Sequence, residues 1–260
     1  MSSVADIRSR FIELKRTGIP HAGTYEIIGA SFVADEPTIF GEVNEEYVKR
    51  ELDWYSSQSL KVADLGDPVP TIWRNIASVN GEVNSNYGYL IFSEANGSQY
   101  DNVLETLISS PSGRRGTMIY TRPTMHEDWQ RDGMQDFVCT NAVNYFIRND
   151  LLHVSVQMRS NDVVFGYRND YAWQRFVQDM LVTDLRDQGL TMNPGEIHWN
   201  AASLHVYERH WDLIPNHDGP ANAPLCDWCD SPTDHTFVLT PSGRYHVGCQ
   251  PDGETIIQEA

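Results

Sequence analysis

The sequence predicts a fold of mixed helices and strands, with one main domain and a small module near its C-terminal end. Its length of 260 residues suits one sizeable core plus an appendage. Segments with helical spacing alternate with short apolar, β-branched runs. A stretch rich in Pro, Gly, Asn and Ala at residues 215–225 reads as a linker. We therefore expect a main domain over residues 1–215 and a module over residues 222–255.

The first half of the chain predicts two helices and a strand. Residues 4–16 have apolar side chains on one helical face and charges elsewhere, which indicates an amphipathic helix. Residues 24–32 are apolar and β-branched, which is typical of a strand. Residues 44–54 predict a second helix, and Asn44 is a favourable capping residue for it. Prolines and a glycine then mark an irregular region.

The second half predicts two further helices and three strands. Residues 99–109 have helical spacing, and the turn SPSG leads from them into a strand at residues 116–121. Two neighbouring strands should follow, at residues 138–148 and 151–159. Residues 171–190 form the longest predicted helix, because their apolar groups keep helical spacing up to a terminal glycine.

The charge balance and the apolar pattern exclude several classes of function. The chain has 36 acidic and 19 basic residues and a net charge of −17, which repels the backbone of long nucleic acids. A few arginines can still hold a small phosphate through charge-assisted hydrogen bonds. No apolar run approaches the ~20 residues that cross a bilayer. The first residues lack the apolar core of a signal peptide, so we expect a cytoplasmic protein with reduced cysteines.

Cys139 stands alone in mid-chain, and a lone cysteine is by default a small buried apolar residue. Its surroundings change that interpretation. The stretch VCTNAVNYFIRNDLLHVSVQMRSNDVVFG, in which the pair Arg159-Ser160 follows Cys139 by twenty residues, resembles the central signature of thymidylate synthases. Other matching motifs occur in the family's order, namely ELDWY at 51–55, TIW at 71–73, NYGY at 86–89, SGRR at 112–115 and SLHVYERH at 203–210. The resemblance covers roughly residues 10–212.

The resemblance implies an α+β fold, a bent mixed sheet with flanking helices whose back face forms a homodimer interface. It also implies a folate-dependent transfer of a one-carbon unit to C5 of a pyrimidine nucleoside monophosphate, with 5,10-methylenetetrahydrofolate as co-substrate. The C5 atom is not nucleophilic enough by itself. Addition of the Cys139 thiolate at C6 would activate it, and a nearby positive charge favours the thiolate.

Three sets of site residues follow from the resemblance. The catalytic set is Cys139, Glu51 and Asp170, with Glu51 organising water and proton transfer around the ring. The substrate-binding set contacts phosphate, sugar and base, and comprises Arg16, Arg114, Arg115, Arg159, Ser160, Asn169, His205 and Tyr207. Within it, Arg114 and Arg115 would reach the phosphate of the other subunit. The folate-binding set comprises Trp73, Tyr87, Asp162 and Gly166.

The base specificity depends on the register after Gly166. Thymidylate synthases typically place an asparagine a few residues further on, where its amide pairs with uracil. Gapless counting from Arg159 puts Asp170 there, as in deoxycytidylate hydroxymethylases. A carboxylate can accept from the amino group of cytosine and from a protonated N3, but it would face O4 of uracil acceptor to acceptor. A one-residue deletion would put Asn169 in that position and favour uracil instead.

The product is predicted from departures from the family pattern. Thr140 replaces the usual histidine after the nucleophile, Met158 replaces a glutamine, and the chain ends in PDGETIIQEA without an apolar tail to exclude water. These departures favour hydration over reduction of the transferred unit. The leading hypothesis is therefore dCMP 5-hydroxymethylation. Thymidylate synthesis from dUMP and hydroxymethylation of CMP are rivals, and an inactive nucleotide-binding scaffold is the alternative from another class.

The final segment carries a predicted zinc site. CxxC, a hairpin and HxxC follow one another, so Cys226, Cys229, His246 and Cys249 can supply four tetrahedral ligands to Zn²⁺. His235 is an alternative fourth ligand. Four protein ligands leave no open position, so the metal would be structural. We expect a small zinc-ribbon-like module.

Overall fold

The structure is a computed structural model that describes residues 2–215, 237–240, 243–246 and 258–259. The chain divides into two compact units. The first comprises Met1–Arg10 with Ile19–Leu213, and the second comprises Phe11–Gly18 with Ile214–Ala260.

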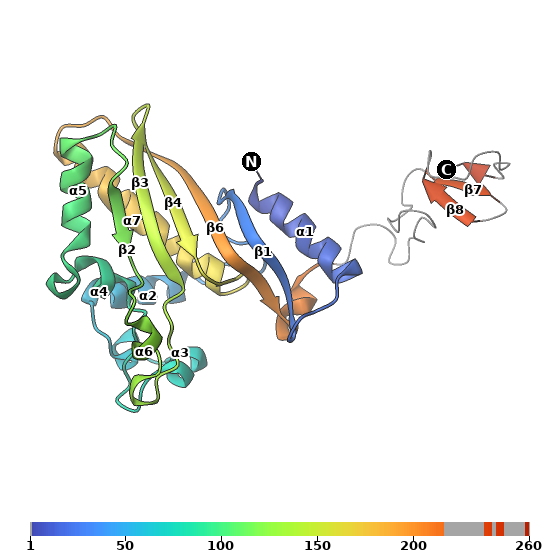
Figure 1. The fold of residues 1–260 in the computed structure, drawn as a ribbon, viewed down its shortest axis with the longest axis horizontal. Coiled ribbons are helices and arrows are strands. Elements are labelled where there is room, and N and C mark those ends of the chain that lie inside the picture. Colours follow the sequence, from blue (N-terminus) through green and yellow to red (C-terminus); the bar gives the residue numbers. More distant parts are fainter. Residues whose placement is uncertain (1, 216–236, 241–242, 247–257, 260) are drawn as a thin grey trace. The chain divides into compact units, whose positions relative to one another are not determined.

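A mixed sheet forms the centre of the first unit (Figure 1). Its strands lie in the order β1 (Thr24–Val33), β6 (Asn193–Tyr207), β4 (Leu151–Met158), β3 (Thr140–Arg148) and β2 (Gly116–Ile119), and the short β5 (Asn161–Asp162) also pairs with β6. β4 and β5 run parallel to β6, whereas the other pairs are antiparallel. The mixed sheet and the α+β class expected from the resemblance are confirmed.

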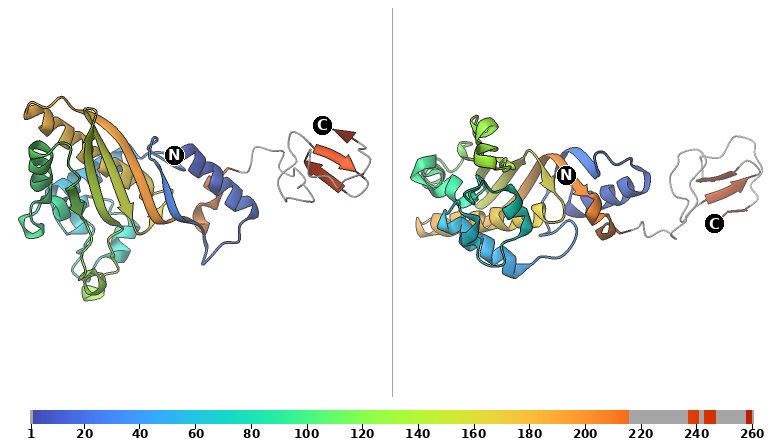
Figure 2. Two further views of the ribbon diagram at one scale, coloured as in Figure 1. Left: turned by 45° about the horizontal axis from the view of Figure 1, so that its top comes forward. Right: turned by 90° about the horizontal axis from the view of Figure 1, so that it is seen from below.

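Helices surround this sheet. The α-helices are α1 (Val4–Thr17), α2 (Glu45–Ser57), α3 (Thr71–Ile76), α4 (Tyr87–Phe92), α5 (Gln99–Ser109), α6 (Met125–Asp128) and α7 (Gly166–Asp187). Short 3₁₀ turns cover Val62–Leu65, Glu94–Asn96, Arg131–Gly133 and Glu208–Leu213. α7 lies along one face of the sheet, behind the strands in Figure 1 and seen from other sides in Figure 2. Trp173, Val177 and Leu181 of α7 are fully buried, as are Val154 and Val156 of β4.

Local sequence signals explain several of these elements. The side chain of Asn44 accepts a hydrogen bond of 2.9 Å from the Tyr47 amide, so the predicted cap of α2 is confirmed. Asn149 and Asp150 have φ values of 53° and 59° and join β3 to β4 in a two-residue hairpin turn. Gly88 is required where it stands, because a Cβ atom there would lie 1.8 Å from the carbonyl oxygen of Tyr55.

Two elements differ from the sequence prediction. α7 begins at Gly166, not at residue 171, because a carboxylate oxygen of Asp162 accepts from the amides of Phe165 (2.9 Å) and Gly166 (3.3 Å) and starts the helix earlier. Asp170 therefore lies inside a helix, not in a loop. The sequence patterns also predict no strand over residues 193–207, where the structure has β6, the longest strand among the described residues.

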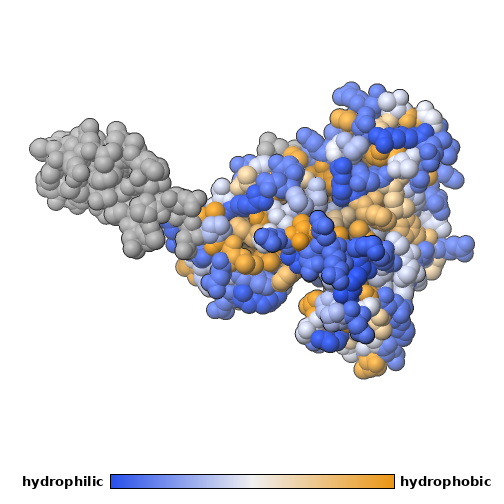
Figure 3. All heavy atoms as spheres, turned by 180° about the vertical axis from the view of Figure 1, so that it is seen from behind, coloured by the Kyte–Doolittle hydropathy of each residue, from blue (hydrophilic) through white to orange (hydrophobic). Residues whose placement is uncertain are grey.

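The outer surface is mostly polar. Figure 3 shows hydrophilic residues over much of one face of the molecule, with hydrophobic residues in separate patches. In the part of the chain that the structure describes, no helix has both the length and the apolar character needed to cross a membrane.

The second unit contains a small antiparallel sheet of β7 (Phe237–Thr240), β8 (Gly243–His246) and β9 (Gln258–Glu259). The backbone of His246 ends β8. Cys226, Cys229, His235 and Cys249 lie outside the described residues. The zinc-ribbon-like module is therefore still a prediction from the sequence.

Candidate active site

Cys139 directly precedes β3 and is half-buried beside Arg159. The Nη2 atom of Arg159 lies 3.5 Å from the Cys139 Sγ atom. The same guanidinium donates to the carbonyl oxygens of Val138 (3.0 Å) and Phe137 (2.6 Å) and lies 4.9 Å from the Phe137 ring centre. These contacts hold a positive charge against the thiol.

The protonation state of Cys139 is decided mainly by burial. Burial raises the pKa of its thiol to about 11, and the Arg159 charge opposes this rise, whereas Asp170 and Asp136 add to it. The thiol is therefore protonated at neutral pH. Because only the thiolate is a strong nucleophile, substrate binding must be accompanied by removal of this proton.

Asp170 lies near the start of α7 and keeps its own proton. Its Oδ2 atom accepts 2.7 Å from Asn161 Nδ2, and Asn161 Oδ1 in turn accepts 3.2 Å from Trp199 Nε1. Burial raises the pKa of Asp170 to about 8 and the nearby Glu51 charge adds to this rise, while hydrogen bonds from Tyr87 and Asn161 oppose it. At neutral pH this carboxyl group can donate through one oxygen and accept through the other.

Asn169 is the rival residue for base recognition and lies next to Asp170 in α7. Successive residues on an α-helix point about 100° apart, so Asn169 and Asp170 cannot both be directed at one atom. The Asp170 charge acts on the Cys139 thiol. The Oδ1 atom of Asn169 is buried and has no hydrogen-bond partner among the described residues.

Glu51 occupies the buried side of α2 and is only 5% exposed. Its Oε1 atom accepts 2.7 Å from the Tyr47 hydroxyl, and that hydroxyl accepts 2.9 Å from Trp73 Nε1. Burial raises the pKa of Glu51 to about 7, although the hydrogen bonds from Tyr47 and Trp73 oppose the shift. A group with this pKa can both take and release a proton near neutrality. Tyr47, one helical turn before Glu51, was not predicted from the sequence.

The raised pKa of Glu51 makes stability depend on pH. Between about pH 4.5 and 7 the folded protein keeps a proton that the unfolded chain releases, so stability falls as pH rises through this window. We expect Glu51→Gln to remove the effect. The wild type should then lose up to about 3 kcal/mol of unfolding free energy relative to this variant between about pH 5 and 8. Urea titrations at about pH 5 and pH 8 measure the unfolding free energy of each protein. Glu46→Gln, on the exposed side of α2, is the control. Parallel pH curves for wild type and Glu51→Gln would contradict it.

A cluster of polar groups lies at the start of α7, where the resemblance expects folate. The Oδ1 atom of Asp162 and the Nε atom of Arg168 are buried without hydrogen-bond partners among the residues that the structure describes. The Arg168 guanidinium lies 4.6 Å from the Phe165 ring centre and donates 2.5 Å to the Glu42 carbonyl. At Gly166, a Cβ atom would come within 3.2 Å of the side-chain amide nitrogen of Asn161. These groups fit a flat ligand that carries both donors and acceptors, as a pterin does.

His205 and Tyr207 project from the end of β6 with their rings 4.9 Å apart in an edge-on arrangement. Burial lowers the pKa of His205, which favours the neutral ring, and its Nδ1 atom lies 3.5 Å from the Ser203 hydroxyl. Burial raises the pKa of Tyr207, and the Cys139 charge adds to the shift, so this hydroxyl lies on the nucleophile's side. The Arg209 guanidinium covers the Tyr207 ring at 4.3 Å.

The structure does not bring together all the arginines of the substrate-binding set. Arg114 and Arg115 are exposed and directly precede Gly116, which pairs with Tyr145, six residues after Cys139. Six strand residues span about 20 Å, so both arginines lie at the opposite end of the sheet from the thiol. Arg16 forms an ion pair of 2.6 Å with Glu13 in a segment of the second unit. Ser160 is half-buried next to Arg159.

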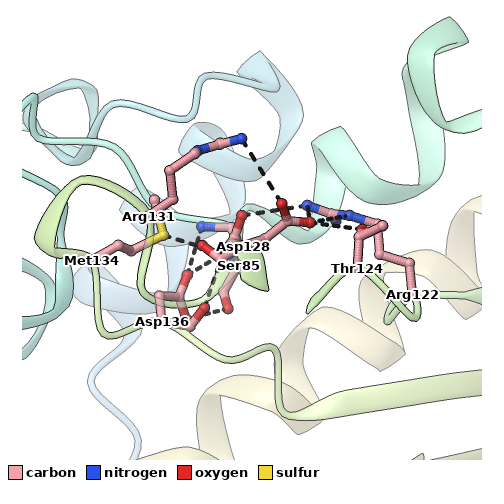
Figure 4. A network of polar contacts seen from close by, with 8 residues as sticks. Ser85, Arg122, Thr124, Asp128, Arg131, Met134 and Asp136 are labelled. Carbon is pink, nitrogen blue, oxygen red and sulfur yellow. Dashed lines mark hydrogen bonds and ion pairs between the residues drawn. The ribbon is translucent and has the colours of Figure 1, made fainter. Parts of the chain in front are cut away.

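A polar network that the motifs did not predict supports the segment before Cys139 (Figure 4). The carboxylate of Asp136 accepts from the amides of Asn84 and Ser85, both at 2.7 Å, and from the Ser85 hydroxyl at 2.6 Å. Asp128 accepts from Arg122 at 2.9 Å in the same network. Asp136 is 4% exposed, and three hydrogen bonds compensate for its burial. The network ties the loop after residue 83 to the approach to the nucleophile.

One other group among the described residues has metal-ligand chemistry. His153, Glu196 and His198 present ligand atoms within 4.8 Å of one another on β4 and β6. The Glu196 amide donates 3.2 Å to Nδ1 of His153, so the neutral ring carries its proton on Nε2. The Glu196 carboxylate lies 3.3 Å from His198 Nε2. These contacts already engage the three side chains, and we assign them no metal.

A half-buried thiol beside a guanidinium, with two carboxyl groups whose pKa values lie near neutrality, is typical of enzymes that use covalent nucleophilic catalysis. Residues 39–218 match the family model described as thymidylate synthase. The chain belongs to the thymidylate synthase family, as its motifs predicted.

Curated relatives divide into two groups. The deoxycytidylate 5-hydroxymethyltransferases of Enterobacteria phages T4 and T6 are 53% identical over 210 residues, which cover 80% of this chain and 84% of each relative. The thymidylate synthase of Fusobacterium nucleatum is 30% identical over 171 residues, which cover 64% of this chain and 58% of the relative. A solved structure, the thermostable thymidylate synthase A from Bacillus subtilis, shares the fold with a TM-score of 0.61 at 20% identity and covers 82% of this chain and 83% of its own.

Proposed function

We propose that this protein transfers a one-carbon unit from 5,10-methylenetetrahydrofolate to C5 of dCMP and hydrates it to 5-hydroxymethyl-dCMP. The observation that carries the proposal is the buried carboxyl group of Asp170, which accepts a hydrogen bond from Asn161 and acts electrostatically on the Cys139 thiol. The similarity to phage proteins named deoxycytidylate 5-hydroxymethyltransferase supports the same activity. Folate supplies the one-carbon unit, and the groups at Asp162, Arg168 and Gly166 would bind its ring.

Asp170 can select cytosine through its proton. Its protonated oxygen would donate to N3 of cytosine while the other oxygen accepts from the amino group. When Cys139 adds to C6, electron density moves toward N3, and the Asp170 proton follows it. The resulting carboxylate then faces two donors. With uracil, N3 already carries a hydrogen and cannot take the Asp170 proton. An ionised Asp170 would face O4, an acceptor, and this unpaired contact costs about 1–3 kcal/mol or more for a charged group.

Cys139 and Glu51 would carry the remaining proton and bond changes. The Cys139 thiol would lose its proton and its sulfur would bond to C6, and C5 would then bond to the one-carbon unit. Loss of the C5 proton to water at the site and departure of tetrahydrofolate would leave an exocyclic methylene on C5. Glu51, with a pKa of about 7, would hold and deprotonate the water that adds to this methylene, and the sulfur would leave C6 as a thiolate when the ring double bond reforms. Arg159, His205, Tyr207 and Ser160 would hold the phosphate and the sugar around these two groups.

A homodimer would complete the phosphate site. Within one chain, Arg114 and Arg115 lie about 20 Å from the thiol along the sheet. A second copy packed against the sheet face opposite α7 could bring its own pair of arginines to this site, and Ile119 on that face is 57% exposed. Arg16 belongs to a segment of the second unit, and its role in phosphate binding stays a prediction from the sequence. The cytoplasmic location and the structural zinc site near the C-terminal end stay predictions from the sequence.

The experiment that tests the proposal is a product assay. The protein is incubated with methylenetetrahydrofolate and dCMP, dUMP or CMP, and the nucleotides are weighed by mass spectrometry. A hydroxymethyl adduct formed preferentially on dCMP is the expected result. Methylated dUMP with dihydrofolate would establish thymidylate synthesis instead, and preference for CMP would overturn the deoxyribose assignment. No product from any of them would leave the scaffold interpretation.

A further inference from the structure

Four tyrosine hydroxyls lie in the core between α7 and the sheet. Tyr87, Tyr100, Tyr120 and Tyr145 are between 0% and 6% exposed. Phenylalanine would fill the same space without removing a hydroxyl from water, which costs free energy unless the hydroxyl is hydrogen-bonded. The resemblance places Tyr87 beside the folate, and Tyr87 also contacts Asp170, but the reaction proposed above uses none of the other three hydroxyls, so these need another explanation.

The inner end of this group touches the base-recognition carboxyl. Tyr87 hydrogen-bonds Asp170 and accepts 3.0 Å from the Thr140 hydroxyl. The rings of Tyr87 and Tyr120 meet edge-on with their centres 5.2 Å apart. The Tyr120 hydroxyl accepts 3.1 Å from Trp173 Nε1, which leaves its own hydrogen free to be donated onward.

The outer end reaches solvent. The Tyr100 hydroxyl donates 2.6 Å to Asp184 Oδ2, and Asp184 is partly exposed. Asp170 and Asp184 both belong to α7, fourteen residues apart, which corresponds to about 21 Å along the helix. The tyrosines therefore connect a buried carboxyl group with a carboxylate in contact with water.

The middle of the group is polar but incompletely paired. Gln174, one helical turn after Asp170, is 0% exposed, and neither atom of its amide has a hydrogen bond of good geometry among the described residues. The same holds for the Tyr145 hydroxyl in the described part of the chain. Both groups nevertheless lie close enough to the Tyr120 hydroxyl for hydrogen bonding to influence its pKa. Buried polar atoms of this kind are typically bridged by ordered water.

We propose that Tyr87, Tyr120, Tyr145 and Tyr100, with water held by Gln174, form a proton relay between Asp170 and Asp184. Each hydroxyl passes its hydrogen to the next acceptor and receives another from behind, so no bond other than O–H changes and no electrons are transferred. The relay exchanges the Asp170 proton with solvent while nucleotide and folate cover the mouth of the site. This inference rests on the proposed function, because it assigns a turnover role to the Asp170 proton.

The kinetic test compares Tyr145→Phe and Tyr100→Phe with Tyr167→Phe. Tyr167 is equally buried and donates 2.8 Å to the Glu36 carbonyl, outside the relay. Turnover of dCMP is measured in H₂O and in D₂O. We expect kcat to fall about tenfold in the two relay variants, less than the loss of a direct acid–base group would cause. Their KM for dCMP should stay unchanged and their solvent isotope effect on kcat should rise. Values equal to those of Tyr167→Phe would overturn the relay.

A crystal structure of the wild-type protein gives a second readout that does not depend on turnover. The relay requires hydrogen bonds that link the Tyr120 and Tyr145 hydroxyls and the Gln174 amide, either directly or through ordered water. A structure in which these groups are not linked would overturn the relay even if dCMP is turned over. Absence of turnover in the wild type with these links present would count against the proposed function alone.

Discussion

Replacement of Cys139 by alanine is expected to lower kcat by about four orders of magnitude or more, because removal of a covalent nucleophile leaves only binding and electrostatic contributions. Binding of dCMP should change little, since the thiol contributes few contacts to the phosphate and sugar. Arg159 keeps its hydrogen bonds to Phe137 and Val138 in this variant. Rapid-quench turnover assays and calorimetric titration with dCMP measure the two quantities separately.

Cys139→Ser is the matched control for this substitution. The hydroxyl has nearly the size of the thiol but is a much weaker nucleophile at neutral pH, so it should be almost as inactive as alanine. An enzyme that kept a tenth of its activity with alanine at this position would not use Cys139 as its nucleophile. If both variants and the wild type bind dCMP without turnover, the protein is a nucleotide-binding scaffold.

Replacement of Asp170 by asparagine is expected to change the base that the protein accepts. An amide cannot deliver a proton to N3 of cytosine, so turnover of dCMP should fall by about 10²–10⁴-fold, the range for a lost acid–base group. The asparagine amide can instead donate to O4 and accept from N3–H of uracil. Binding of dUMP should therefore improve. Parallel kcat/KM measurements with dCMP and dUMP give the specificity ratio.

Asn169→Ala separates the two possible registers. Asn169 lies next to Asp170 but points about 100° away on the helix, so its truncation should leave the preference for dCMP over dUMP unchanged. A large change in base preference with Asn169→Ala, together with a small one for Asp170→Asn, would reverse the assignment of the base-recognition residue.

Much of the fold could be predicted from local signals. The cap at Asn44, the hairpin at Asn149 and Asp150 and the strands on either side of it depend on interactions between near neighbours in sequence. The start of α7 could not be predicted in this way, because it depends on the Asp162 carboxylate four residues before the first helical residue. β6 was missed because its partners β1 and β4 are distant in sequence, and its N-terminal half includes Pro194 and Gly195.

The candidate site was predicted only where a motif carries the residue. Cys139, Arg159 and Asp170 are recognisable from their spacing. Sequence reasoning missed four residues whose importance comes from neighbours in space, namely Tyr47, Asn161, Asp136 and Arg168. Tyr47 contacts Glu51, and Asn161 contacts Asp170. Asp136 accepts a hydrogen bond from a loop some fifty residues earlier. Their residue types are common and carry no signal by themselves.

The types and the order of the chemical groups can be read from the amino-acid sequence, and their motifs were enough to assign the thymidylate synthase family. The protonation of these groups depends on burial, which is a property of the folded chain. Burial raises the pKa of Asp170 to about 8 and that of Glu51 to about 7, and burial depends on contacts among α2, α7 and the sheet. The helix that begins at Gly166 also fixes Asn169 and Asp170 in directions about 100° apart, which counting residues along the sequence does not show.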